Sequence, residues 1–151
     1  MPTFIKSIVI AAPVETVFGF HEREDALRLL SPRFPAVRVI KKTGGIEAGS
    51  KVELKIGPFS WTALHTAYEK NRLFVDEQIE GPFAQWIHRH EFQALGEPLG
   101  RRTRLTDRLE FQLPGGVWVN RLLGWTVQLG LRQMFNERHR LTRRYCEEAT
   151  P

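Results

Sequence analysis

The stretch FVDEQIEGPFAQWIHRHEF, residues 74–92, alternates between two kinds of side chain on both sides of the pair Gly81-Pro82. One parity carries aromatic, imidazole, carboxylate and amide groups: Phe74, Asp76, Gln78, Trp86, His88, His90 and Phe92. Side chains of a β-strand point alternately to opposite faces of a sheet, so this alternation predicts two strands joined by a turn. One face of the predicted hairpin therefore carries both aromatic and polar side chains, a combination typical of the lining of a binding site.

The same alternation continues outward along the chain. Further strands are predicted at residues 4–10, 37–43, 51–56, 61–67 and 104–113. Turn residues separate the central ones: Gly57-Pro58, Lys70-Asn71 and the loop at residues 96–100. Consecutive strands joined by short turns predict an antiparallel meander.

Helical patterns flank this run of strands. Pro13 stands where a first short helix can begin, and Asp25 is a candidate N-cap for a second over residues 26–30. From about Val117 to Glu147, apolar residues recur at spacings of three and four, which predicts one helix of about 45 Å. The predicted class is therefore α+β, with the long helix burying its apolar stripe, Leu122 and Leu123 included, on the sheet.

Composition limits the class of protein. The chain has 151 residues, of which 42% are hydrophobic and 26% charged, so we expect one globular domain over residues 1–151. Its single cysteine, Cys146, excludes an internal disulfide and a four-cysteine zinc site. No membrane span and no secretory leader are recognisable, so we expect a soluble, cytoplasmic protein.

The chain is basic, with 22 Lys and Arg against 17 Asp and Glu, which raises the expectation of an anionic partner. Much of the charge lies at Arg101–Arg108 and Arg132–Arg144, which we interpret as solvated faces of a strand and of the long helix. No nucleic-acid-binding module is recognisable, so nucleic acid is not the expected partner. His21 and His139 are expected to lie at the surface or at a rim.

Turn positions predict which inner residues face one another across the strands. Directly opposed residues have Cβ atoms about 4.5–5.5 Å apart, so the pairing brings imidazoles and carboxylates together. The predicted pairs are Leu54 with Trp61, Ala63 with Gln78, His65 with Asp76, Asp76 with His88, Gln78 with Trp86, and His90 with Asp107. Asp107 lies among apolar residues, and buried carboxylates are rare unless paired, which makes His90 its expected partner.

The order strand, two short helices, six strands and long helix resembles the START-like (SRPBCC) superfamily over essentially the whole chain. The opening Ala12-Pro13 and Val17-Phe18, the run at residues 74–92, Asp107 and Pro114-Gly115 resemble a bacterial ligand-binding family within it. Pollen allergens, START domains and aromatic polyketide cyclases share this layout. The resemblance implies a helix-grip fold, in which a curved seven-stranded antiparallel sheet encloses a cavity against the long helix. It implies no particular reaction.

Three functions follow as hypotheses. The first is binding of a small hydrophobic or amphipathic molecule, such as a lipid, isoprenoid, quinone or polyketide. The second is a cyclase or dehydratase in which His88 or His90 acts with Asp76 or Asp107 as an acid/base pair. The third is an interaction module for a partner enzyme. The expected ligand-binding residues are Trp61, His65, Phe74, Asp76, Gln78, Trp86, His88, His90, Phe92 and Asp107.

The imidazole and carboxylate cluster has three interpretations. It is a buried hydrogen-bond network that shapes the cavity, a polar end that orients a ligand, or a catalytic or metal centre. Histidine and aspartate suit zinc or iron, but alternate histidines on a strand are a weak signal. We therefore expect no metal and no other cofactor, and the sequence predicts no oligomeric state.

Overall fold

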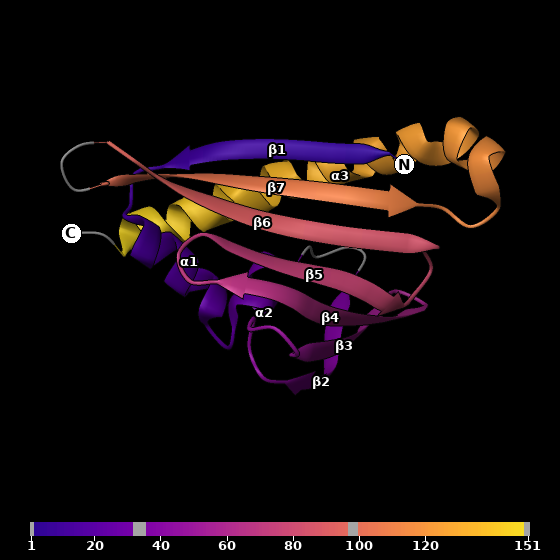
Figure 1. Ribbon diagram of the computed structural model, residues 1–151, viewed down its shortest axis with the longest axis horizontal. Helices are drawn as coiled ribbons and strands as arrows, with labels where there is room; N and C mark the ends of the chain where they lie inside the picture. The colour runs from indigo at the N-terminus through magenta and orange to yellow at the C-terminus, as the bar shows by residue number, and fades with distance from the viewer. Residues whose placement is uncertain (1, 32–35, 97–99, 150–151) are drawn as a thin grey trace.

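The computed structural model describes residues 2–31, 36–96 and 100–149. Its strands form one antiparallel sheet in the order β1-β7-β6-β5-β4-β3-β2 (Figure 1). The bounds are β1 Thr3–Ile10, β2 Val37–Thr43, β3 Lys51–Ile56, β4 Phe59–Glu69, β5 Leu73–Glu80, β6 Gln85–Leu95 and β7 Arg102–Gln112. The first strand thus pairs with the last, and the remainder follow as the predicted meander.

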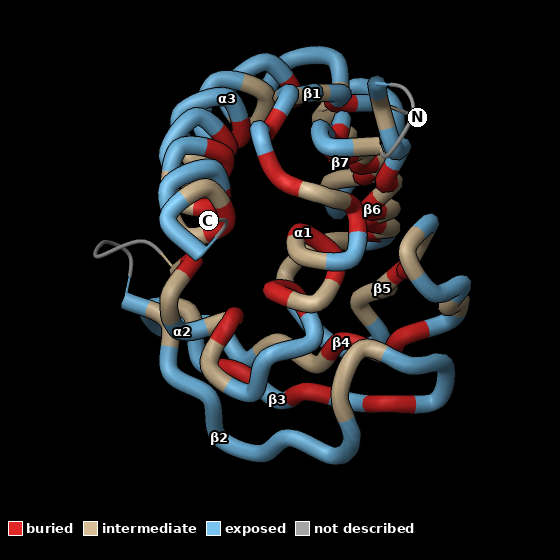
Figure 2. Tube along the Cα trace, turned by 90° about the vertical axis from the view of Figure 1, so that its left-hand side faces the viewer, coloured by how far each residue is buried: buried red, intermediate tan, exposed pale blue. Residues whose placement is uncertain are grey.

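Helices fill the open side of the curved sheet. Two short helices, α1 (Val14–Glu22) and α2 (Ala26–Leu30), follow β1, and the long helix α3 (Gly116–Glu148) ends the described chain. Viewed nearly along α3, the sheet curves from β1 round to β2, with α3 across the opening and α1 within the curve (Figure 2). This is the predicted α+β helix-grip architecture. Among the described residues, none of the helices combines the length and the hydrophobicity that a membrane span requires.

The predicted cross-strand register is confirmed at five of the six pairs: Leu54–Trp61, Ala63–Gln78, His65–Asp76, Asp76–His88 and His90–Asp107. The sixth, Gln78 with Trp86, does not form, because the β5–β6 ladder ends at Glu77–Ile87. Gln78 instead turns its amide to Phe83, donating from Nε2 to the carbonyl at 2.7 Å and accepting from the backbone N–H at 3.1 Å. The Gln78 side chain therefore closes the turn at Gly81-Pro82.

The two halves of α3 differ in what they bury. Leu131 and Phe135, from the middle of the helix onward, are buried against the sheet. In the N-terminal half, Leu122 and Leu123 are 68% and 51% exposed, so the predicted continuous buried stripe is wrong there. The first turns of α3 run beyond the ends of β1 and β7 (Figure 1), which leaves them no sheet to cover. Helical periodicity predicts which residues share a face, but not how far along the helix a partner extends.

Candidate functional site

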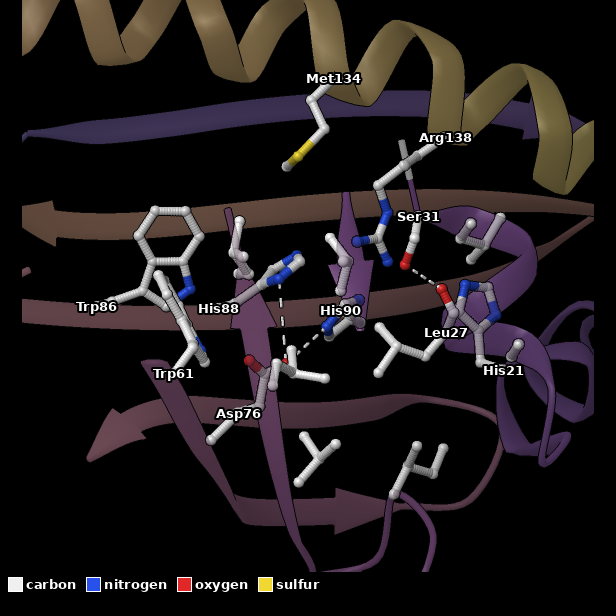
Figure 3. A pocket seen from close by; sticks show the side chains of 18 of the residues that line it. His21, Leu27, Ser31, Trp61, Asp76, Trp86, His88, His90, Met134 and Arg138 are labelled. Carbon is white, nitrogen blue, oxygen red and sulfur yellow. Dashed lines mark hydrogen bonds and ion pairs between the residues drawn. The ribbon is translucent and has the colours of Figure 1, made fainter. Parts of the chain in front are cut away.

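A cavity of about 440 Å³ lies between the sheet and the helices α2 and α3 (Figure 3). Ligand pockets in proteins commonly measure about 300–1,000 Å³, so this volume suits a small organic molecule. Apolar side chains from α2, α3, β3 and β4 supply most of the wall, among them Leu30, Leu54, Ala63, Leu131 and Phe135. Strands β5 and β6 add Asp76, His88 and His90.

Two tryptophans form the apolar end of the cavity. The rings of Trp61 and Trp86 meet edge to face, with centroids 5.2 Å apart at 87°. Phe83 packs on both, at 5.8 Å from Trp61 and 4.8 Å from Trp86. Edge-to-face packing of this kind holds aromatic rings in defined positions. This end offers a rigid apolar wall to the hydrophobic part of a ligand.

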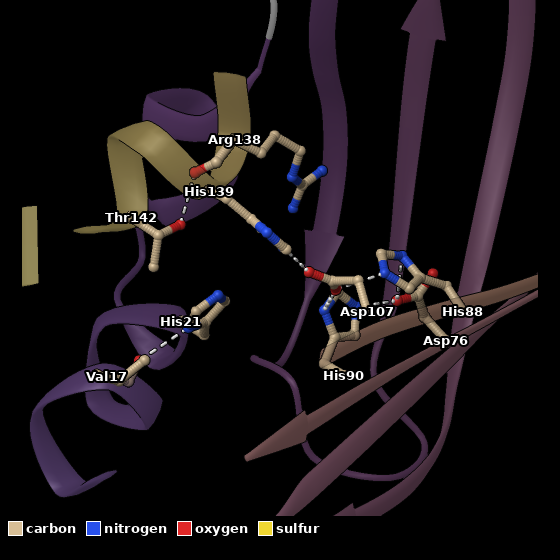
Figure 4. Close-up of polar contacts among 9 residues, drawn as sticks. All are labelled: Val17, His21, Asp76, His88, His90, Asp107, Arg138, His139 and Thr142. Carbon is tan, nitrogen blue, oxygen red and sulfur yellow. Dashed lines mark hydrogen bonds and ion pairs between the residues drawn. The ribbon is translucent and has the colours of Figure 1, made fainter. Parts of the chain in front are cut away.

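Asp107 on β7 is the centre of the polar cluster (Figure 4). Its Oδ1 accepts from His88 Nε2 at 2.8 Å and lies 3.0 Å from His90 Nδ1, and its Oδ2 accepts from His139 Nε2 at 2.6 Å. Burial opposes ionisation of this carboxyl, but the hydrogen bonds from the three imidazoles hold its pKa well below the usual value. Asp107 is therefore a carboxylate that joins β6, β7 and α3.

His90 lies between two carboxylates. Its Nδ1 faces Asp107 Oδ1 and its Nε2 faces Asp76 Oδ2, each at 3.0 Å. Burial lowers the pKa of His90, but the two carboxylates outweigh it and raise the pKa above the usual value. Two acceptors at hydrogen-bond distance require a proton on each ring nitrogen, so His90 is an imidazolium. The cation stacks on Phe74, with centroids 3.9 Å apart.

Asp76 completes this ion pair from β5. Burial raises its pKa, but the hydrogen bond from His90 and the charges of His88 and His90 lower it to about 2. The His90 imidazolium thus forms ion pairs with two carboxylates, Asp76 at the cavity wall and Asp107 behind it.

His88 differs from His90 in having one ring nitrogen without a close partner. Its Nε2–H donates to Asp107, while its Nδ1 lies 4.0 Å from Asp76 Oδ2, too far for a hydrogen bond. Burial and the neighbouring His90 charge lower the pKa of His88, so its ring is neutral. A neutral imidazole that donates through Nε2 carries its lone pair on Nδ1. His88 therefore presents a base that is oriented by a buried carboxylate.

The expectation that His21 and His139 lie at the surface is wrong. His21 is 8% exposed and lines the cavity, and its Nδ1–H donates to the Val17 carbonyl at 2.8 Å. Burial lowers the pKa of His21 to about 3. His139 is 2% exposed, and its Nδ1 is the one buried side-chain polar atom without a hydrogen-bond partner in the described chain. With Nε2 donating to Asp107, this Nδ1 is an acceptor, the less costly group to leave unpaired.

Arg138 also departs from the expected solvated face of the long helix. It is half-buried, lines the cavity, and points from α3 toward the end where His90 lies (Figure 3). Its guanidinium carbon lies 5.4 Å from the centroid of Phe135. Burial lowers the pKa of Arg138, opposed by the charges of Asp107 and Asp76, and a guanidinium nevertheless stays charged at neutral pH.

Seven of the ten predicted site residues line the cavity: Trp61, His65, Phe74, Asp76, Trp86, His88 and His90. His65 is neutral, because burial lowers its pKa, and its Nδ1 lies 3.3 Å from the Ser50 carbonyl. Three predicted residues lie elsewhere. Gln78 holds the turn described above, Phe92 packs on Phe18 with centroids 5.0 Å apart, and Asp107 lies behind the histidines.

Three of the described residues could hold a metal ion. One ligand atom each from Asp76, His88 and His90 lies within 4.8 Å of the others. Asp107 would orient both imidazoles from behind, as carboxylates do for metal-bound histidines. A metal would have to displace the proton that joins His90 Nε2 to Asp76. The cluster as it stands is satisfied by that proton.

Comparison with known proteins gives a family and a fold. The model of the family described as polyketide cyclase / dehydrase and lipid transport matches residues 10–140. No curated protein sequence matches the chain.

Solved structures similar to the chain include the protein TTHA0849 from Thermus thermophilus, with 17% identity and a TM-score of 0.75 over 99% of this chain and 100% of that one. The Zhui aromatase/cyclase from Streptomyces has 13% identity and a TM-score of 0.74, over 97% and 93%. A START superfamily protein from Mycobacterium smegmatis has 16% identity and a TM-score of 0.69, over 98% and 99%. At these identities the likeness is one of fold.

Proposed function

Because the chain belongs to the polyketide cyclase / dehydrase and lipid transport family, we propose that its cavity binds a small hydrophobic or amphipathic molecule of the lipid, isoprenoid, quinone or polyketide class. The observation that carries the proposal is a cavity of about 440 Å³ with tryptophans at one end and ionised groups at the other. Apolar walls release water on binding, at about 25 cal/mol per Å² of apolar surface buried. The few polar groups orient the ligand.

Native mass spectrometry of gently purified protein tests the proposal together with a titration of phenyl-naphthylamine, a neutral dye that fluoresces in apolar surroundings. The titration compares two substitutions of glycines at which an added Cβ meets nothing within 4 Å: Gly130→Phe, at the cavity wall, and Gly19→Phe, away from it. We expect saturable dye binding that Gly130→Phe weakens and Gly19→Phe retains. No saturable binding, or equal binding by both variants, would refute the proposal.

A second candidate function, acid/base catalysis in the same cavity, is favoured by His88. Its Nε2–H is held by Asp107 at 2.8 Å and its Nδ1 lone pair is unoccupied at the cavity wall, which is the arrangement of a histidine general base. Such a base would remove a proton next to a ligand carbonyl, as a cyclisation or dehydration requires.

Proton removal from nitrobenzisoxazole tests this second candidate without knowledge of the substrate. The base takes the ring C–H proton, the N–O bond breaks, and a coloured cyanophenolate forms. We expect His88→Ala to lose about a hundredfold in rate, the lower range for a general base, and added imidazole to restore part of it. A rate unchanged by His88→Ala would eliminate His88 as the base.

A further inference from the structure

Arg138 is a half-buried cation at the cavity wall to which no described residue gives a direct hydrogen bond or ion pair. Besides the His90 imidazolium, which lies between two carboxylates, three cationic side chains line the cavity: Arg23, Lys42 and Arg138. Arg23 is paired with Asp25 at 2.8 Å, and Lys42 is exposed on β2. Arg138 is half-buried, and no ion pair or hydrogen bond joins its guanidinium to any described residue. A guanidinium has five N–H donors, and taking it out of water without an acceptor is costly.

The carboxylates in its vicinity are already engaged. Asp76 directs Oδ2 to His90 Nε2 at 3.0 Å, and both oxygens of Asp107 face imidazole nitrogens at 2.6–3.0 Å. Both carboxylates favour the charge of Arg138 at longer range, but neither comes within 4.0 Å of it. The neutral rings of His21 and His65 supply no negative charge. A direct partner for Arg138 is therefore left to whatever fills the cavity, whether water or a ligand.

We propose, resting on the binding function above, that the ligand is an amphipathic acid whose carboxylate binds Arg138 while its apolar part packs against Trp61 and Trp86. A planar guanidinium matches a carboxylate through two parallel N–H···O bonds, the strong charge-assisted kind. Arg138 and the tryptophan pair lie at opposite sides of the cavity (Figure 3), so head and tail have separate places. Asp76 and Asp107 act on the same region as carboxylates, and their negative charge disfavours a phosphate dianion more than a singly charged head group.

Competition against phenyl-naphthylamine tests the proposal, with dodecanoate and dodecanol as competitors of equal chain length. The dye and the alcohol carry no charge, so they report on the cavity itself. Arg138→Met removes the guanidinium and keeps an apolar stem of similar length. Arg132→Met is the matched control, since Arg132 lies on the same helix but is exposed. All titrations are run at about pH 8, where the carboxylic acid is ionised.

We expect the unmodified protein and Arg132→Met to bind dodecanoate at least about tenfold more tightly than dodecanol. In Arg138→Met that preference should disappear, while dye and dodecanol bind as before. A preference that survives Arg138→Met, or no preference in the unmodified protein, overturns the assignment of the acid and leaves the binding function intact. Failure of the unmodified protein to bind either the dye or dodecanol overturns both.

Discussion

Replacing Asp107 with Asn tests whether the buried carboxylate stabilises the fold. The substitution keeps the size of the side chain but removes the negative charge that three imidazole nitrogens face at 2.6–3.0 Å. The new amide also directs N–H groups at ring nitrogens that already donate. His90 then keeps a single carboxylate, Asp76, for its buried positive charge.

The loss is large because Asp107 is 3% exposed, so water cannot replace the missing partner. Removing one member of a buried ion pair typically costs about 3–5 kcal/mol. Against a total stability of about 5–15 kcal/mol for a domain, such a loss is a substantial fraction. We expect Asp107→Asn to lose at least about 3 kcal/mol of its free energy of unfolding.

Urea unfolding followed by tryptophan fluorescence measures this loss as a shift of the midpoint at constant slope. Asp25→Asn is the matched control, because Asp25 forms an exposed ion pair with Arg23 at 2.8 Å, and exposed pairs contribute about 0–1 kcal/mol. A loss below about 1 kcal/mol for Asp107→Asn, or one equal to that of Asp25→Asn, would show that the reasoning about the buried cluster is wrong.

Three further predictions concern other residues. The free energy of unfolding should fall as the pH drops below about 6.5, the pKa of His21 in the unfolded chain, because burial lowers the pKa of His21 in the folded protein to about 3. Between these two pKa values the unfolded chain binds a proton at His21 that the folded protein does not bind, so stability falls by about 1.4 kcal/mol per pH unit. Urea midpoints at several pH values should therefore vary less in His21→Leu, and an unchanged pH dependence would contradict the assignment. Phe135→Ala should cost about 3–5 kcal/mol in urea unfolding because Phe135 is fully buried, whereas Leu122→Ala, at 68% exposure, should cost below about 0.5; comparable losses would count against the described packing of α3. Cys146, 1% exposed and with its pKa raised by burial to about 12, should react with iodoacetamide only on unfolding, and rapid labelling of the native protein would disprove its burial.

Turn chemistry made much of the sheet predictable from the sequence. Gly57 and Asn71 adopt the left-handed conformation, with φ of 56° and 64°, at turns that the sequence indicates. Each turn centre fixes a register, and register fixes which side chains meet, so the pairs His65–Asp76 and His90–Asp107 follow. The predicted pairing of Gln78 with Trp86 failed because the Gln78 amide hydrogen-bonds to the backbone of Phe83. The alternation of side chains along a strand gives no information about such local bonds.

The contributions of the helices were harder to predict because a helix offers several faces. His139 lies four residues after Phe135, and His21 lies four after Val17, so both continue apolar stripes that pack inward. That signal was present, but the surrounding charges in residues 132–144 indicated solvent. Arg138 lies at the edge of the stripe, where the sequence alone does not decide between cavity and water.

The pairing of β1 with β7 has a consequence for how the chain folds. Ser7 and Thr106 share a hydroxyl hydrogen bond across this pair, although 99 residues separate them in the sequence. Contacts between distant segments slow folding, since the entropy of closing a long loop is lost before the contact forms. We expect refolding in milliseconds to seconds rather than microseconds, with the outer edge of β7 open to intermolecular strand pairing until the amino-terminal strand arrives.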